Sequence, residues 1–417
     1  MSDWKKTTVG EVATAFLSGG TPNTKRPDYW EGEIPWITSK WLGSNLELTT
    51  GEKFVSEEAV KKTSTKVVPK DSIIFATRVG VGKVGINRLD LAINQDLAGV
   101  LIDNERYDIK FLAYQLKIDS IQQYVAMNKR GATIKGITRD CLEQVRLNLP
   151  PLPEQKKIAH IVSTVERAIE AQERIIQTTT ELKKALMHKL FTEGLRNEPQ
   201  KQTEIGRVPD SWEVVELSDV CQFQSGGTPS KKNPAFWQGT VPWVSPKDMK
   251  RPRLYDVTDH ISQEALESGS KLAPAGSVFV VVRGMILAKT VPVALAEVPM
   301  AINQDMRAIV PGPKLRSDFL LYALETLRES LFKKVGRSGH GTCTLMSHEV
   351  AAFKIPLPDP DTQEVVAAAI QNLERKKELH EEKRTQLQAV FRTLLHELMT
   401  ARTRVHELQL QSTTSTN

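Results

Sequence analysis

The chain has 417 residues, 40% hydrophobic and 25% charged, which suits about two to four folded domains and excludes a disordered chain. Its 56 basic and 50 acidic residues leave a net charge of +6, which permits nucleic-acid binding without requiring it. No run approaches the roughly 18 apolar residues of a membrane span. The first residues lack the apolar core of a secretory signal, and the three cysteines lie too far apart in sequence to suggest a disulfide framework, so we expect a cytoplasmic protein.

An internal repeat dominates the sequence. The segment Phe16–Pro22 (FLSGGTP) recurs 207 residues later as Phe223–Pro229 (FQSGGTP). The segment Ala92–Asp96 (AINQD) recurs unchanged 209 residues later as Ala301–Asp305. A long and nearly constant offset is typical of a duplicated module, because solenoid repeats are much shorter.

Within each copy, the predicted elements follow one order: a mixed α/β segment, a Pro-rich hinge and a long helix. In the first copy, Ser72–Thr77 and Gln95–Ile102 are predicted strands, because they are short, β-branched and bounded by turn residues. The apolar spacing of Ile109–Met127 predicts one helix. The hinge Leu149–Pro153 follows, and proline is well placed just before a helix.

A long amphipathic helix is predicted from Glu154 to about Gly194, where apolar residues recur at spacings of three and four without Pro or Gly. The second copy repeats this pattern from Thr362 to about Val405, and polar Glu198–Pro209 is the predicted linker between copies. Each apolar seam needs a partner, and the nearest is the long helix of the other copy. The residues predicted to pair the helices are Ile158, Val162, Val165, Ile169, Ile176, Leu182, Leu186, Leu190, Val366, Ile370, Leu373, Leu387, Val390, Leu394 and Leu398.

Two short motifs are interpreted as structural. Gly80–Gly85 matches GxGxxG, but no helix pattern follows it, so we interpret it as a loop between strands. Asn233–Phe236 is similar to the motif with which amino-methyltransferases hold a flipped base, but its counterpart Arg26–Tyr29 lacks the Asn. We interpret it as a turn before Trp237. A single-chain methyltransferase or nuclease therefore stays an alternative without a supporting motif.

Polar, basic loops that recur in both copies are the candidate DNA contacts. They follow the Gly-Gly-Thr-Pro turn, follow the Ile/Val-Pro-Trp run and precede each hinge. Basic side chains neutralise phosphates, and Arg, Lys, Asn and Gln can contact base edges. A coiled-coil scaffold without a DNA role is the other alternative, but it explains the helices and leaves the loops unexplained. The candidate DNA-binding residues are Thr21, Lys25, Arg26, Ser39, Lys40, Arg78, Lys83, Lys129, Arg130, Thr133, Lys135, Thr228, Lys231, Lys232, Lys247, Arg283, Arg337, Ser338, His340 and Thr342.

Over roughly residues 4–405, the chain resembles the specificity (S) subunit of Type I restriction–modification systems. The second copy departs from the pattern at its hinge and in the loop before it, where Lys135 has no counterpart. The segments that carry the resemblance are Leu149–Ala159, which leads into the long helix, Glu181–Phe191, which closes it, and Ile205–Val215.

The resemblance implies an α/β fold with two tandem mixed α/β target recognition domains, each followed by a long helix. The two helices would pair as an antiparallel coiled coil with pseudo-twofold symmetry. The expected domains are residues 1–150 (first recognition domain), 151–197 (central long-helix region), 198–358 (linker and second recognition domain), 359–410 (distal long-helix region) and 411–417 (disordered tail).

The resemblance also implies function. The chain would be a non-catalytic subunit that recognises a bipartite double-stranded DNA target and directs two methyltransferase subunits and restriction/translocase subunits to it. The apolar residues of the long helices would also dock these partners. No cofactor is expected on the chain itself, because S-adenosylmethionine, ATP and Mg would bind to the partner subunits.

Overall fold

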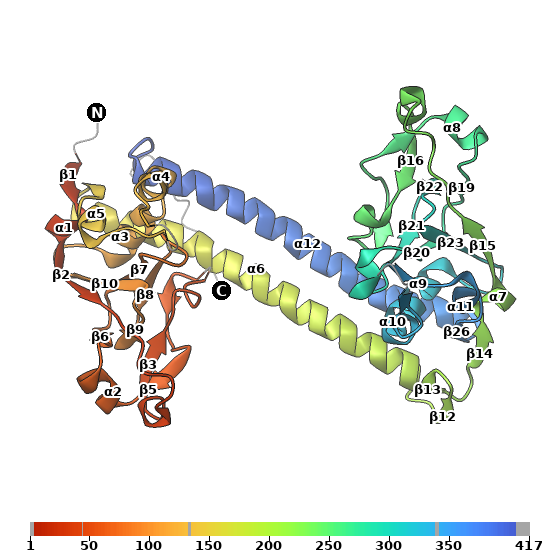
Figure 1. Cartoon of the computed structure of the whole chain (residues 1–417), viewed down its shortest axis with the longest axis horizontal. Helices are drawn as coiled ribbons and strands as arrows, with labels where there is room; N and C mark the ends of the chain where they lie inside the picture. Colours follow the sequence, from red (N-terminus) through yellow and green to blue (C-terminus); the bar gives the residue numbers. More distant parts are fainter. Residues whose placement is uncertain (1–3, 44, 132–134, 338–341, 406–417) are drawn as a thin grey trace, which may run out of the picture. The chain divides into compact units, whose positions relative to one another are not determined.

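The computed structural model describes residues 4–43, 45–131, 135–337 and 342–405, and its chain divides into two units (Figure 1). Unit 1 comprises the residues up to Arg174 together with those from His380 onward, and unit 2 comprises Ile175–Leu379. Helix α6 (Leu152–Glu193) begins in unit 1 and ends in unit 2, whereas α12 (Pro360–Met399) begins in unit 2 and ends in unit 1. Each unit therefore contains one α/β domain and half of each long helix.

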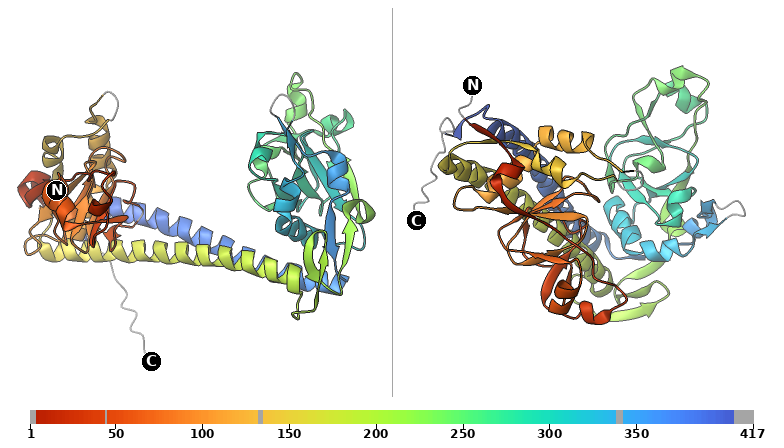
Figure 2. Two further views of the ribbon diagram at one scale, coloured as in Figure 1. Left: turned by 60° about the horizontal axis from the view of Figure 1, so that its bottom comes forward. Right: turned by 60° about the vertical axis from the view of Figure 1, so that its left-hand side comes forward.

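Both predicted long helices are confirmed, and Figure 2 shows from two further sides that each is continuous. Helix α6 stops at Gly194, whose left-handed φ of 68° is typical of a helix C-terminus. Helix α12 ends at Met399, six residues before the predicted Val405. In unit 1 the start of α6 shares a core with the end of α12, and in unit 2 the end of α6 shares one with the start of α12, so the pairing is antiparallel within each unit.

Unit 1 contains a five-stranded sheet of order β2-β10-β7-β8-β4, a four-stranded sheet of order β5-β3-β9-β6, and the pair β1-β11. Its strands are β1 (Lys5–Thr8), β2 (Ala13–Ser18), β3 (Ile34–Ile37), β4 (Glu47–Leu48), β5 (Lys53–Val55), β6 (Lys66–Val68), β7 (Ile73–Ala76), β8 (Val84–Asn87), β9 (Leu91–Ile93), β10 (Leu97–Ile102) and β11 (Arg146–Leu149). Its shorter helices are α1 (Val9–Val12), η1 (Pro27–Tyr29), α2 (Glu57–Lys62), α3 (Ile109–Leu116), α4 (Asp119–Met127) and α5 (Arg139–Glu143). The two strands predicted in this copy are confirmed as β7 and β10.

Unit 2 repeats this topology, with sheets β15-β23-β20-β21-β17 and β18-β16-β22-β19 and the pair β14-β26, and adds two hairpins, β12-β13 and β24-β25. Its strands are β12 (Gln200–Thr203), β13 (Gly206–Pro209), β14 (Glu213–Glu216), β15 (Cys221–Ser225), β16 (Val241–Val244), β17 (Arg253–Leu254), β18 (His260–Ile261), β19 (Leu272–Ala273), β20 (Val278–Val281), β21 (Val293–Ala296), β22 (Met300–Ile302), β23 (Met306–Pro311), β24 (Gly336–Arg337), β25 (Cys343–Thr344) and β26 (Lys354–Leu357). Its shorter helices are α7 (Leu217–Val220), η2 (Pro234–Trp237), η3 (Pro246–Asp248), α8 (Gln263–Glu267), η4 (Met285–Ala288), α9 (Ser317–Thr326), α10 (Arg328–Phe332) and α11 (Ser347–Ala351).

Two predicted elements differ from the structure. The single helix over Ile109–Met127 is two helices, α3 and α4, because the backbone of Ile118 is extended (φ −69°, ψ 149°). The break places Ile118 in the core at 6% exposure while both helices bury an apolar face. The polar linker Glu198–Pro209 contains the hairpin β12-β13, which turns at Gly206 with φ 109°.

Most predicted helix-pairing residues lie buried or half-buried, but Leu182 and Val390 are exposed at 53% and 46%, so their assignment to the pairing is wrong. These two positions are equivalent in the repeat, 208 residues apart. At each one, the following residue faces the domain instead, since successive helical residues point about 100° apart. The buried apolar residues of the long helices that the prediction missed are Ala159, Met187, Phe191, Ala367, Leu395 and Met399.

The Gly-Gly-Thr-Pro turn of each unit packs directly on the backbone of the Ala-Ile-Asn-Gln-Asp segment. A Cβ atom at Gly19 would lie 2.1 Å from the Ile93 carbonyl oxygen and 2.4 Å from that of Asn94. The Gly20 N–H donates to the same Ile93 carbonyl at 2.9 Å. In unit 2, a Cβ at Gly226 would lie 2.0 Å from the Asn303 carbonyl oxygen. The repeated motifs of the sequence thus pack against each other.

We expect Gly19→Ala to lower the free energy of unfolding by about 1–3 kcal/mol, the usual cost of overpacking a well-packed site. Chemical denaturation of the full chain measures it. Gly43→Ala is the matched control, because the nearest atom to a Cβ there is 4.0 Å away. Equal stability of the two variants would contradict the close approach of the backbones.

Candidate nucleic-acid interface

Backbone hydrogen bonds bring four segments of unit 1 together: the end of β2, the loop after β7, the Asn94–Asp96 turn and the antiparallel bridge between Arg130 and Gly136. The N–H groups of Thr77 and Arg78 donate to the Asp96 carbonyl at 2.8 and 3.3 Å. Ile137 N–H donates to the Thr77 carbonyl at 2.8 Å, and Arg130 and Gly136 exchange bonds of 2.7 and 2.9 Å. These loops are therefore held by the fold, and Arg78, Gln95 and Arg130 are exposed among their side chains.

A cavity of about 600 Å³ lies where these segments meet. Arg78, Arg130 and Arg139 line it together with Gln95 and with Phe16 and Ser18 of β2. Arg78 and Arg130 are exposed, and neither forms an ion pair within the described part of the chain. Arg139 pairs with Glu143 at 2.6 Å and lies 4.9 Å from the Phe16 ring centroid. The cavity is a cationic recess of the kind that attracts phosphate or a base edge.

Gln95 lines this cavity and lies between Asn94 and Asp96, which form hydrogen bonds with each other. Asn94, only 4% exposed, donates to the Asp96 carboxylate at 3.0 Å and accepts from the Asp96 N–H at 3.2 Å. Gln95 itself is exposed, and its amide oxygen accepts from the Thr21 hydroxyl at 2.6 Å. That bond uses one lone pair of the amide oxygen, and the amide N–H₂ group has no hydrogen-bond partner among the described residues. A Gln amide is the group that pairs with adenine in the major groove.

Unit 2 has the same construction. Val282 and Arg283 N–H groups donate to the Asp305 carbonyl at 2.8 and 3.2 Å, and the Thr228 hydroxyl binds the Gln304 amide oxygen. The hairpin β24-β25 carries Arg337, which is exposed like Arg283. Unit 2 also has an arginine that unit 1 lacks. The guanidinium of Arg307 contacts the hydroxyls of Ser225 and Ser347, whereas Ala98 occupies the equivalent position.

The sequence predicts these loops as candidate contacts but does not predict Gln95, Gln304, Arg139 or Arg307, which the structure places beside them. A usable signal existed for the two glutamines, since they lie in the Ala-Ile-Asn-Gln-Asp segment, which recurs without change. No comparable signal marked the arginines, because Arg139 lies on the predicted approach to the hinge and Arg307 replaces an alanine.

The other predicted DNA-binding residues fall into four groups. Arg26 is occupied by Asp28 at 2.8 and 2.6 Å and Lys247 by Asp259 at 2.6 Å, and the hydrogen bond from Arg26 lowers the pKa of Asp28. Ser39 is 2% exposed, so its assignment as a DNA contact is wrong, because residues of the Ile-Pro-Trp strand and its turn are packed inward. Thr342 is half-buried, and Thr133, Ser338 and His340 lie outside the described residues. The remaining exposed residues are Lys25, Lys40, Lys83, Lys129, Lys135, Lys231 and Lys232.

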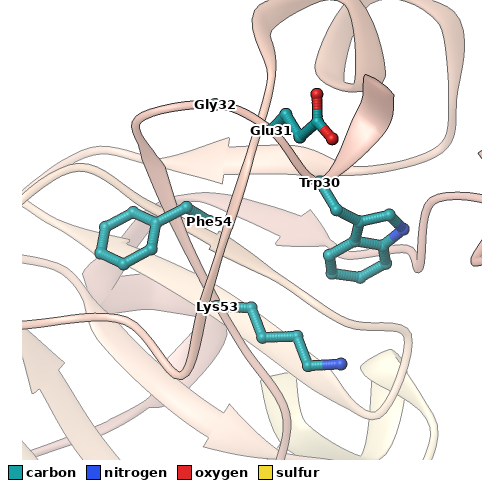
Figure 3. Close-up of a pocket in the computed structure, with 5 residues that line it drawn as sticks. All are labelled: Trp30, Glu31, Gly32, Lys53 and Phe54. Atoms are coloured by element: carbon teal, nitrogen blue, oxygen red, sulfur yellow. The ribbon is translucent and has the colours of Figure 1, made fainter. Parts of the chain in front are cut away.

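A tryptophan donates a hydrogen bond to each Gly-Gly-Thr-Pro turn. Trp36 is buried, and its indole N–H donates to the Gly20 carbonyl at 3.1 Å, as Trp243 donates to Gly227 at 3.0 Å. Beside this core, a hollow of about 470 Å³ borders Trp30 (Figure 3). There the Lys53 ammonium lies 5.2 Å from the Trp30 ring, and Phe54 points the other way.

Both structural interpretations of short motifs are confirmed. Gly80–Gly85 runs from the loop after β7 into β8, with φ values of 68° at Gly80 and 95° at Gly82. The Asn233 side chain accepts from the Ala235 N–H at 3.2 Å and so caps the short helix η2, which includes Trp237.

Neither a membrane span nor a metal cluster is found in the part of the chain that the structure describes. No described helix combines the length and the apolar character needed to cross a bilayer. Among the same residues, no three or more His, Cys, Asp or Glu side chains are grouped as metal ligands.

The α/β domains of the two units have the same topology, and each unit contains half of both long helices. The chain is therefore built from two copies of one module. The family model described as "Type I restriction modification DNA specificity domain" matches residues 1–180 and again 209–389. Because these matches cover most of the sequence, the chain belongs to this family, as the resemblance predicted.

Similar proteins include specificity subunits of three restriction enzymes. The MjaVIII subunit of Methanocaldococcus jannaschii is 23% identical over 422 residues, covering 97% of this chain and 94% of that protein. The MjaIX subunit of the same organism is 28% identical over 277 residues, covering 64% of this chain and 62% of that protein. The Escherichia coli EcoR124I/EcoR124II subunit is 36% identical over 150 residues, 36% of this chain and 37% of that protein. The match thus spans less than two thirds of two of these relatives.

The fold is also similar to a solved structure. The S subunit of a Type I restriction–modification system from M. genitalium superposes with a TM-score of 0.64 at 17% identity, covering 95% of this chain and 96% of that one. A likeness at this identity establishes the fold, and it confirms the predicted architecture of two tandem mixed domains, each followed by a long helix.

Proposed function

We propose that the chain is the DNA-binding specificity subunit of a Type I restriction–modification system. Each unit contacts one half of a bipartite double-stranded target. The chain performs no catalysis and brings two methyltransferase subunits and restriction/translocase subunits to that target in the cytoplasm. S-adenosylmethionine, ATP and Mg bind to those partners.

One observation carries this proposal: the same four segments meet in both units, and in each unit they carry exposed arginines and a glutamine whose amide oxygen accepts from a threonine hydroxyl. Arg is the residue that binds phosphate or guanine in two-point contacts, and Gln can do the same with adenine. Two related but unlike sites fit two unlike half-sites, since the loop before the hinge differs between the copies.

Partner docking is supported by the exposed side of the long helices. Large apolar residues stand exposed there at 46–53%: Leu182, Val365, Leu379 and Val390. Exposed apolar residues gathered on one kind of element are typical of a protein interface. Leu182 and Val390, which do not pair the helices, are thus available for the docking role that the sequence also predicted.

We expect Arg78→Ala/Arg130→Ala to weaken DNA binding of the full chain, and Arg283→Ala/Arg337→Ala to weaken it through the other unit. Removing one phosphate contact lowers the slope of log K against log salt by about one, whereas removing one base contact costs about 1–3 kcal/mol. Titration of duplex DNA at several salt concentrations, in the presence of the methyltransferase subunits, measures both.

Lys61→Ala/Lys62→Ala is the matched control, since it also removes two charges. Both lysines lie on α2, where they pair with Glu57 and Glu58. Affinity and salt dependence that stay unchanged in both arginine variants would refute the DNA-binding role of the two sites and would favour a scaffold.

A further inference from the structure

A buried polar cluster joins the long helices to the α/β domain of unit 2. The Glu374 carboxylate on α12 accepts from the Lys183 ammonium on α6 at 2.6 Å and from the Tyr322 hydroxyl on α9 at 2.7 Å. Lys183 also donates to Glu325 on α9 at 2.8 Å. The side chains of Lys183, Glu374 and Glu325 are only 19%, 8% and 12% exposed. Lys183 thus supplies one cation to two carboxylates.

Unit 1 contains the equivalent cluster, in which every position is 208 residues earlier or later in the chain. Tyr114 donates to Glu166 at 2.6 Å, as Tyr322 does to Glu374. Here the lysine is Lys117, on the α/β domain, and its ammonium lies 3.2 Å from Glu166. The helix that crosses from the other half of the chain contributes Phe391, whose ring centroid is 6.2 Å from that of Tyr114.

The Tyr and the Glu are the same in the two clusters, whereas the residues at the other two positions differ in charge. Lys117 corresponds to Glu325, and Phe391 corresponds to Lys183. Each cluster consists of three residues from one half of the chain and one from the other half. The domain that already contains its lysine receives a phenylalanine, and the domain that contains a second glutamate receives a lysine. The charges are therefore matched only when unlike halves pair.

Pairing of like halves would leave charges unmatched. Two second halves would place Phe391 against Glu325 and Glu374, and both carboxylates would lose Lys183. Two first halves would place Lys183 beside Lys117, with Glu166 as the shared carboxylate. Removing one partner of a buried charge pair is strongly destabilising, because the remaining charge stays desolvated.

Other charges near the cluster reduce this penalty in part. Arg253 lies 3.7 Å from Glu374 and binds Glu297 at 2.6 Å, and Arg328 lies 3.4 Å from Glu325. Both arginines belong to the second half of the chain and would remain in a pair of second halves. Burial alone lowers the pKa of Lys183, but Glu325 and Glu374 raise it above its ordinary value, so the ammonium stays charged in place.

We propose that Lys183 and Phe391 are pairing-specificity residues, through which each half of the chain selects the unlike half over a second copy of itself. The presence or absence of a charge at these two positions thus determines which half of the chain each long helix pairs with. Selection of the unlike half keeps two different α/β domains in one assembly.

The first test replaces residues of the unit 2 cluster by those of the unit 1 cluster within the full chain. Lys183→Phe and Glu325→Lys should each lower the denaturation midpoint, because each leaves the charges of unit 2 unmatched. The double variant reproduces the unit 1 set and should recover most of the loss. Rescue distinguishes matched charges from loss of packing alone, and a double variant as unstable as the sum of the singles would overturn the proposal.

The second test measures partner choice. A protease site placed in the β12-β13 turn at Glu204–Gly206 allows the folded full chain to be cut into its two halves. Native mass spectrometry then follows exchange between cut chains of different mass. The chain without further substitutions should give unlike pairs. In the double variant Lys117→Glu/Glu325→Lys, the cluster charges of each half match those of a second copy of the same half. Pairs of like halves should therefore increase by about tenfold or more.

Lys156→Glu/Glu329→Lys is the matched control, because it makes the same charge changes at exposed positions. It should keep unlike pairing. Like pairs that are already abundant without the substitutions, or that do not increase in Lys117→Glu/Glu325→Lys, would refute the selection. The DNA-binding proposal does not enter either test.

Discussion

Replacing Gln95 by alanine should relax base choice in one half of the DNA target and leave the other half unchanged, and Gln304→Ala should do the reverse. Each amide oxygen accepts from a hydroxyl, Thr21 or Thr228, which leaves its second lone pair and the N–H₂ group for a base. Removing a two-point base contact costs about 1–3 kcal/mol, or roughly a 10- to 100-fold loss of discrimination at one base pair.

The measurement is selection from a randomised duplex library by the full chain with its methyltransferase subunits, confirmed by mapping of methylated adenines. Gln123→Ala is the control, because Gln123 is an exposed glutamine on α4 outside the recess. Thr21→Val should give a smaller relaxation at the same half-site as Gln95→Ala. If Gln95→Ala altered both half-sites equally, the assignment of one recess to one half-site would be wrong.

The loops were predictable from the sequence, but the orientation of their side chains was not. Ser39 and Lys40 are adjacent and polar, yet one is buried and the other exposed. Arg26 resembles any basic DNA contact until its pairing with Asp28 is seen. Within Asn94–Asp96, all three residues are polar, and only the structure shows that the outer two bind each other while the central one is exposed.

The duplication and the long helices followed from repeat spacing and apolar periodicity, because both features are local or repeated in the chain. Which residues make up each unit could not be predicted. Each long helix is divided between two units, and no change in amino-acid composition marks Arg174 or Leu379. The exposure of Leu182 and Val390 also depended on distant contacts. Their neighbours Lys183 and Phe391 face the α/β domains, and this sets the rotation of the helix.

Inserting four residues into both long helices, after Arg174 in α6 and after Leu379 in α12, should keep both half-sites and lengthen the spacer between them. These positions are the unit boundaries, so every contact within a unit is retained. Four residues add ~6 Å and a rotation of about 400°, so the apolar seams stay nearly in phase. On DNA, ~6 Å corresponds to one or two base pairs at about 3.4 Å each.

Inserting two residues at the same positions should instead abolish assembly. The rotation is about 200°, so a seam that is in phase in one unit points away from its partner in the other. Thermal unfolding and co-purification with the methyltransferase subunits measure this loss, and methylated-site mapping measures the spacer in the four-residue variant. A spacer that stays unchanged in a folded four-residue variant would show that the long helices do not set the separation of the half-sites.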